Sequence, residues 1–209
     1  MPATPLPMFP LGTVLYPHVA INLHLFEPRY RALGRDLSAG DGRFGIVLIS
    51  RGSEVGGGEG RYDIGTKARV TEALELPDGR WQLIARGEAR IRVSTWLPDD
   101  PYPVALVQEL PDLGPEAEPA AELRGRAERA VKRALALKAE LDEPAHSASI
   151  EISPDPVRAG YELAAVAPVT THDHQRLLEA ESAYARLSLV AELATEAGDV
   201  MLARLAQGG

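Results

Sequence analysis

The 209-residue sequence contains no cysteine. This absence excludes disulfide bonds, thiolate metal sites and cysteine nucleophiles, and it fits a reducing compartment. No apolar run approaches the roughly 18 residues that a membrane-spanning helix needs. The start of the chain has four prolines in its first ten residues and lacks the basic segment of a secretory signal. We therefore expect a cytoplasmic protein with no membrane segment.

Positive charge is also scarce, because 22 Lys and Arg stand against 30 Asp and Glu, a net charge of −8. Residues 1–113 hold 12 basic and 14 acidic side chains, and residues 114–209 hold 10 and 16. An acidic surface repels phosphate backbones, so the balance disfavours nucleic-acid binding. Hydrophobic residues make up 45% of the chain, which is ordinary for a globular protein that buries a core without cross-links.

The first part of the chain has the patterns of β-strands. Residues 80–93 alternate apolar and polar side chains, with Ile84 as the exception, which predicts a strand with one buried face. Gly87 within it indicates a bulge or bend. Pro77-Asp78-Gly79 predicts a hairpin turn from a preceding strand at 66–76. In that strand the apolar residues in phase are Ala68, Val70, Leu74 and Leu76. Further strands are expected at 44–49 and 102–110.

Helices are expected at 28–37 and throughout the second part. Pro28 suits a first helical turn because its missing N–H would have no partner there. A linker at 111–119 carries three prolines, and beyond it the chain becomes rich in Ala, Leu, Glu and Arg. The expected later helices are 116–141, one from a cap at Ser153 or Asp155 to 167, 172–180 after Thr171, and one from Ser182 to about 206. We expect a β domain at 1–113 and an α-helical domain at 114–209.

Several motifs of the β-rich part carry a family resemblance. The opening reads PMFPLGTVLYP at 7–17 and LHLFEPRYR at 23–31, and it is followed by FGIVL at 44–48, GTKARV at 65–70 and RGEARI at 86–91. In this order the motifs resemble the amino-terminal substrate-binding domain of Lon proteases. The helical part resembles that family at 176–187. The resemblance implies an α+β fold, with a PUA-like β pseudo-barrel followed by an α-helical bundle.

Patterns that would indicate catalysis are missing. The Gly-rich stretch 56–60 lacks the Gly-Lys-Ser/Thr ending of a phosphate-binding P-loop, and it is better interpreted as a loop between strands. No serine stands in a Gly-x-Ser-x-Gly elbow. His172 and His174 are two residues apart, which places them on different sides of a helix and disfavours a shared metal ion. The chain ends at 209, without the ATPase and Ser-Lys protease domains of a Lon protease. We expect a stand-alone, non-enzymatic domain with no cofactor and no metal.

The resemblance implies recognition of protein or peptide segments, in an adaptor or regulatory role in proteolysis. The proline-rich opening is stiff, and any of its apolar residues that remain exposed would bind such a segment by groove insertion or strand addition. One face of this strand is expected to carry Arg86, Arg90 and Arg92. These arginines could bind an acidic group of a partner. The favoured interpretation is that they pair with Glu72 or Glu88. The candidate substrate-binding residues are Phe9, Leu11, Tyr16, Phe26, Arg29, Arg86 and Arg90.

Three alternatives remain open at this point. PUA-like folds also bind RNA, and an RNA site would need a local basic groove on the arginine strand. A small-ligand or enzymatic site at the junction of the two domains would need convergent polar groups there. A homo-oligomer would be held together by the amphipathic last helix.

Overall fold

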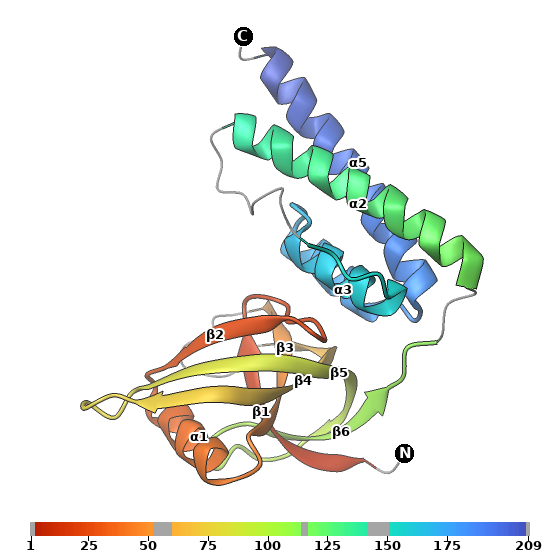
Figure 1. Ribbon diagram of the computed structural model, residues 1–209. Coiled ribbons are helices and arrows are strands. Elements are labelled where there is room, and N and C mark those ends of the chain that lie inside the picture. The colour runs from red at the N-terminus through yellow and green to blue at the C-terminus, as the bar shows by residue number, and fades with distance from the viewer. Residues whose placement is uncertain (1–2, 52–59, 114–116, 142–150, 208–209) are drawn as a thin grey trace. The chain divides into compact units, whose positions relative to one another are not determined.

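The structure is a computed structural model that describes residues 3–51, 60–113, 117–141 and 151–207 (Figure 1). The chain divides into two compact units, Met1–Pro111 and Asp112–Gly209. In the described residues the first, which we call the β unit, contains six strands and a helix, and the second, the helical unit, contains four helices. The predicted α+β class is confirmed. The Gly-rich stretch lies largely outside the described residues.

The six strands of the β unit form one sheet in the order β2-β5-β4-β3-β1-β6. β6 also pairs with β5, and this second pairing closes five of the strands into the predicted pseudo-barrel. β1 and β3 run parallel, and the other neighbours run antiparallel. The strands are β1 Thr4–Leu11, β2 Ala20–Leu25, β3 Arg43–Arg51, β4 Gly60–Glu75, β5 Trp81–Trp96 and β6 Val104–Leu110.

β5 is the strand that three others share. β4 pairs with it over residues 81–92. β2 pairs with the first part of β5, residues 81–86, and β6 pairs with the second part, residues 90–96. Because a strand has two edges and β4 occupies one of them, β2 and β6 follow each other along the second edge. β2 therefore lies beside the closed barrel and not within it.

The change of partner along β5 occurs at Gly87. Its N–H donates to Val19 O and its carbonyl accepts from His18 N, both at 2.9 Å. His18 has φ 67° and follows Pro17, as in a type II turn. A Cβ on Gly87 would lie 2.2 Å from Tyr16 O, so no larger residue fits there. The register against β4 also shifts at this point, which confirms the predicted bulge.

The predicted alternation of β5 fails at Arg90. This side chain was expected beside Arg86 and Arg92 on a polar face, but it is 3% exposed and its Nη2 donates to Pro111 O at 3.1 Å. The cause is β6, whose Leu110 pairs with Arg90 and leads directly into the accepting carbonyl. Arg86 and Arg92 are exposed, so the expected face of three arginines does not form.

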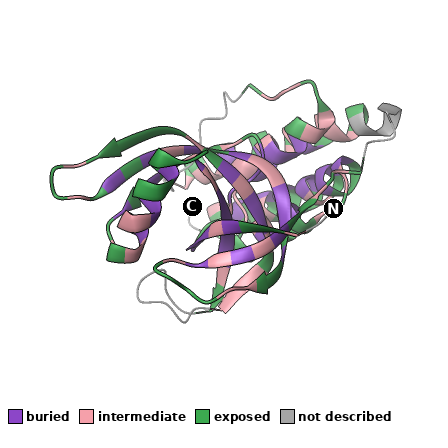
Figure 2. Ribbon diagram, turned by 90° about the horizontal axis from the view of Figure 1, so that it is seen from below, coloured by how far each residue is buried: buried purple, intermediate pink, exposed green. Residues whose placement is uncertain are grey.

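The β unit has two hydrophobic clusters. Neighbouring residues of β1 and β3 belong to different clusters: Phe9 and Ile46 to one, Met8 and Val47 to the other. Successive strand residues point to opposite faces, so both strands are buried on two sides, as predicted for 44–49. Helix α1, Pro28–Ala39, packs into the first cluster through its buried residues (Figure 2). Pro28 stands in its first turn, as predicted.

The helical unit consists of α2 Ala117–Glu140, α3 Pro156–Val166, α4 Thr171–Glu179 and α5 Ala183–Gln207. Asp155 caps α3, which decides between the two caps considered. Thr170 caps α4, one residue before the predicted Thr171. Ser182 Oγ accepts from Ala185 N at the start of α5, as predicted. No helix in the described residues has the length and apolar character needed to cross a membrane.

A buried ionic cluster holds the helical unit together. The Arg186 side chain is fully buried, and its Nη2 lies 3.0 Å from Asp112 Oδ1. The same nitrogen donates to Ala180 O, and Nε donates to Leu177 O. The Tyr161 hydroxyl donates a hydrogen bond to Asp112, and the centroid of its ring lies 3.8 Å from the guanidinium carbon of Arg186. The first residue of the unit is thereby fixed to α3 and α5, since breaking such a buried pair is strongly destabilising.

Replacing Gly87 with alanine is expected to lower the free energy of unfolding by about 2–3 kcal/mol, because the backbone oxygen of Tyr16 cannot move away from the new methyl group without breaking the bulge. Urea unfolding followed by circular dichroism measures this. Gly125→Ala in α2 is the matched control. Its new Cβ meets the flexible end of Arg129 at 3.4 Å, and alanine favours the helix. Equal stability of the two variants would contradict the role given to Gly87.

Candidate functional site

Three of the four apolar residues predicted to bind a substrate contribute to the core. Phe9, Leu11 and Tyr16 are buried, and the ring of Phe9 meets that of Tyr30 edge-on at 4.5 Å. Phe26 follows β2 and is 51% exposed. Substrate contact by these residues stays a prediction, and of the four it is Phe26 whose side chain is broadly accessible to a partner.

The three predicted arginines have different surroundings. Arg29 pairs with Glu27 at 3.2 Å and lies over the Tyr30 ring, as expected for a structural partner of Glu27. Arg90 is buried, as described above. Arg86 is exposed and pairs in register with Ala20 at the start of β2. The two accessible candidates, Phe26 and Arg86, therefore lie near opposite ends of this strand.

The strand register places six side chains on the outer face of β2, β5 and β4. Residues directly opposite one another across antiparallel strands form rows on one face. The rows are Asn22–Ile84–Glu72 and His24–Gln82–Leu74. A groove of about 490 Å³ lies over them. The ring of His24, which lines this groove, is 6.0 Å from that of Phe26. Because this face carries both polar and exposed apolar groups, it is suited to binding and not to burial.

None of these six residues was predicted as a site residue, and Leu74 departs furthest from its expected position. It was expected in phase with Ala68 and Val70, yet it is 56% exposed. The register of β4 against β5 shifts between Val70 and Glu72, which leaves Thr71 as an extra residue. A bulge of one residue transfers every later side chain to the opposite face. No signal in the sequence marks Thr71 as a bulge.

A second groove, of about 320 Å³, runs along β2 and reaches the end of β1. It brings together three predicted residues, because Phe9, Leu11 and Phe26 all line it. Tyr30 of α1 and residues 21–24 of β2 complete most of its lining. β2 thus contributes to both grooves. We call β2, the two grooves, Phe26 and Leu74 the β2 surface.

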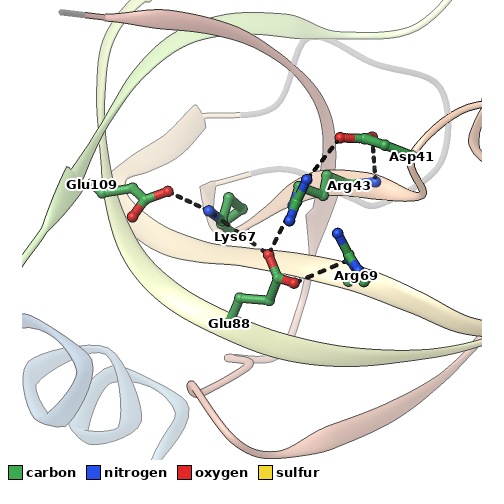
Figure 3. Close-up of polar contacts among 6 residues, drawn as sticks. All are labelled: Asp41, Arg43, Lys67, Arg69, Glu88 and Glu109. Carbon is green, nitrogen blue, oxygen red and sulfur yellow. Dashed lines mark hydrogen bonds and ion pairs between the residues drawn. The ribbon is translucent and has the colours of Figure 1, made fainter. Parts of the chain in front are cut away.

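A separate group of charged side chains gathers around Glu88, the residue after the bulge glycine (Figure 3). Its carboxylate receives Arg43 Nε at 3.1 Å, Arg69 Nε at 3.2 Å and Lys67 Nζ at 3.7 Å. Lys67 also pairs with Glu109 of β6, and Arg43 pairs with Asp41. Three acids and three bases therefore connect β3, β4, β5 and β6. The pairing of Glu88 was predicted with arginines of its own strand, whereas the arginines that pair with it are Arg43 of β3 and Arg69 of β4.

A groove of about 440 Å³ lies beside this ion-pair network, between the start of β1 and the end of α1. Its charged residues have partners: Arg43 and Lys67 belong to the network, and Asp36 accepts a 2.7 Å hydrogen bond from the Tyr102 hydroxyl. Burial and that hydrogen bond raise the pKa of Tyr102 to about 12. These groups are tied to one another, so the arrangement indicates a structural role.

The histidine pair of α4 has a structural setting. Asp173, between His172 and His174, accepts a hydrogen bond from the hydroxyl of Thr170 and pairs with Arg176 at 2.8 Å. The Thr170 hydrogen bond, followed by the contact with Arg176, lowers the pKa of Asp173. In the described residues no group of three or more His, Cys, Asp or Glu side chains is arranged to hold a metal ion.

The last helix leaves apolar side chains exposed at its end. Val200 is 62% exposed, and Leu202 is also exposed. A shallow groove beside them is lined by parts of α2, α4 and α5. Homo-oligomerisation through this helix stays a prediction.

Comparison with known proteins gives consistent results. The sequence model of the family described as ATP-dependent protease La (LON) substrate-binding domain matches residues 5–196. The Lon protease of Desulfovibrio desulfuricans is 28% identical over 187 residues, which cover 88% of this chain and 21% of that protein. Lon protease 2 of Myxococcus xanthus is 27% identical over 199 residues, 94% of this chain and 24% of that protein. The chain thus spans about a quarter or less of these relatives.

Solved structures show the same fold. The Lon N-terminal domain protein from Xanthomonas campestris superimposes with a TM-score of 0.64 at 28% identity, covering 90% of this chain and 98% of that one. The N-terminal domain of the Mycobacterium avium complex Lon protease gives a TM-score of 0.64 at 14% identity, covering 92% and 99%.

Asp41 is expected to make the stability of the β unit depend on pH. The backbone N–H of Arg43 is the largest cause that lowers the pKa of Asp41, followed by the Arg43 side chain. A lowered pKa in the folded state stabilises the fold above the ordinary carboxyl pKa of about 3.9, and this contribution disappears as the pH falls through the lowered value. We expect Asp41→Asn to melt at a lower temperature than the wild type at pH 7, with a difference that closes below about pH 4.

Differential scanning calorimetry between pH 7 and pH 2.5 measures the melting difference. Asp63→Asn on β4 makes the same change in net charge at an exposed position, and it is expected to lower the melting temperature less at pH 7. A difference for Asp41→Asn that persists unchanged to pH 2.5 would show that the carboxylate charge is not what stabilises this loop.

Proposed function

Because the chain belongs to the Lon substrate-binding domain family, we propose that it recognises segments of other proteins and that it does so on the β2 surface. The observation that carries the proposal is the exposure of Phe26 and Leu74 beside the two grooves. Large apolar side chains at the rim of a concave surface gain free energy when a partner covers them. The grooves supply the complementary depressions for a partner's side chains.

The mixed character of the surface favours polypeptide over nucleic acid. Asn22, His24 and Gln82 offer hydrogen-bonding groups between the apolar ones, as interfaces with protein segments require. The RNA alternative depended on three arginines of β5, of which Arg90 is buried. Arg43, Arg69 and Lys67 are held by Glu88. With a net charge of −8, the chain lacks the excess of cations that phosphate binding draws on.

The role we propose is that of a recognition module, an adaptor or regulator in proteolysis, acting in the cytoplasm. The relatives named above are Lon proteases, and this chain matches the part of them described as substrate-binding. The proposed contribution of these residues is therefore binding of the protein that is to be degraded, and not bond cleavage. The absence of cysteine supports the cytoplasmic location.

A double variant, Phe26→Asp with Leu74→Asp, tests the site. Both side chains are about half exposed, so the free energy of unfolding in urea is expected to stay within about 0.5 kcal/mol of the wild-type value. Affinity for a carboxymethylated, permanently unfolded protein is expected to fall about tenfold or more, because each lost apolar contact contributes about 1 kcal/mol. Fluorescence anisotropy measures the affinity, and light scattering measures protection of a heat-unfolding client.

Val200→Asp is the control, because Val200 is a comparably exposed apolar residue in the helical unit. It is expected to bind the unfolded protein like the wild type. A wild-type protein that neither binds nor protects any of several unrelated clients would contradict recognition itself. If the control and the double variant lose affinity for the unfolded protein equally, the β2 surface is not the binding site.

A further inference from the structure

β2 has one paired edge and one open edge. All six of its residues, Ala20–Leu25, pair with β5 on one side. Within the described residues no second strand pairs with β2 on the other side. The strand therefore presents a row of main-chain N–H and C=O groups at the border of the β unit, beside the groove that reaches the end of β1.

The bulge identifies which residues direct their main-chain groups to the open edge. Gly87 donates to Val19 O, so the carbonyl of Val19 points toward β5. In an antiparallel ladder this direction alternates, so Ile21, Leu23 and Leu25 also face β5. The N–H and C=O groups of Ala20, Asn22 and His24 face the open edge.

The sequence of β2 also lacks the residues that usually prevent another chain from pairing with an exposed edge. Proteins shield exposed edges with charged residues, prolines, bulges within the strand or a covering element. β2 reads AINLHL and contains no charged residue and no proline. Its ladder with β5 runs without a register shift. An edge of this kind favours pairing with another extended chain.

We propose that the open edge of β2 binds an extended segment of a client protein as an additional strand. This inference rests on the proposed function and specifies how the client is held. Only another extended chain offers donors and acceptors at the spacing of a ladder, so the chemistry of the edge selects an extended backbone. Three outward-facing residues allow hydrogen bonds that do not depend on the client's sequence.

The adjoining groove determines which side chains are preferred in the client strand that is added to β2. Successive residues of an added strand point to opposite faces, so every second side chain is directed to one side of the sheet. On β2 the buried side chains are Leu23 and Leu25, which belong to the same cluster as Phe9 and Leu11 of the groove lining. An apolar side chain at every second position of the client fits there. The intervening positions lie on the side of Asn22 and His24 and are expected to be polar.

The proposal is tested with a fluorescein-labelled nonapeptide that alternates valine with threonine or lysine. N-methylation removes one main-chain donor at a time without changing a side chain. We expect affinity to fall about tenfold on methylation at alternate positions and to stay within twofold at the positions between. A tenfold change corresponds to about 1.4 kcal/mol, which lies within the range of a single hydrogen bond. Fluorescence anisotropy with the full chain gives each dissociation constant.

On the protein, Asn22→Pro removes an outward N–H, and Asn22→Ala removes the side chain while keeping that N–H. Proline is tolerated in an edge strand when its nitrogen faces away from the ladder. We expect Asn22→Pro to weaken peptide binding about tenfold and Asn22→Ala to leave it within threefold. If Asn22→Pro does not fold by circular dichroism, the N-methylated series on the wild-type protein decides the question.

Binding that is lost in the Phe26 and Leu74 double variant but is indifferent to N-methylation would overturn strand addition and leave the proposed function standing. If the protein protects clients from aggregation but has no affinity for the nonapeptide, strand addition is likewise overturned and the proposed function stands. Loss of both client protection and peptide binding in the wild type would instead count against the proposed function. A stable dimer of the free protein that dissociates in Asn22→Pro would show that a second copy occupies the edge, and would also overturn the proposal.

Discussion

The β unit depends on one close contact, the approach of the Tyr16–Pro17 backbone to Gly87. It ends the pairing of β2 with β5 and leaves the rest of that edge to β6, which closes the barrel. The same bulge precedes Glu88, whose carboxylate collects three cations from β3 and β4. Because β2 is joined to the barrel through β5 alone among the described strands, it keeps an edge and two flanking grooves. A constraint on one glycine thus produces both the closed part and the open part.

Much of this fold was predictable because its signals are local. The Pro77-Asp78-Gly79 turn, the first turn of α1 and the bulge at Gly87 each follow from what one residue type allows in its backbone, and the structure contains all three. The family motifs gave the order of the β-rich part. Positions within strands were also predictable where the alternation is undisturbed, as in the first half of β5.

The candidate site was less predictable because it depends on pairing between distant strands. Leu74 is exposed since Thr71 is an extra residue against β5, and that register is set by both strands together. Arg90 is buried because β6, which begins 14 residues later in the sequence, leads Pro111 to its guanidinium. Phe9 and Leu11 are apolar residues of a proline-rich segment, which is typical of a binding segment, yet both pack in the core. Composition alone does not separate these two uses of an apolar residue.

The charge network and the β2 surface should respond differently to ionic strength. Partly exposed ion pairs such as those of Glu88 weaken as the Debye length shortens, to about 3 Å in 1 M salt. Apolar grooves and main-chain hydrogen bonds carry no net charge, and sulfate or phosphate salts strengthen apolar burial. Salt therefore separates the two properties of this unit: in concentrated sulfate the ion pairs that connect its strands weaken, while its capacity to retain an apolar segment is preserved or increased.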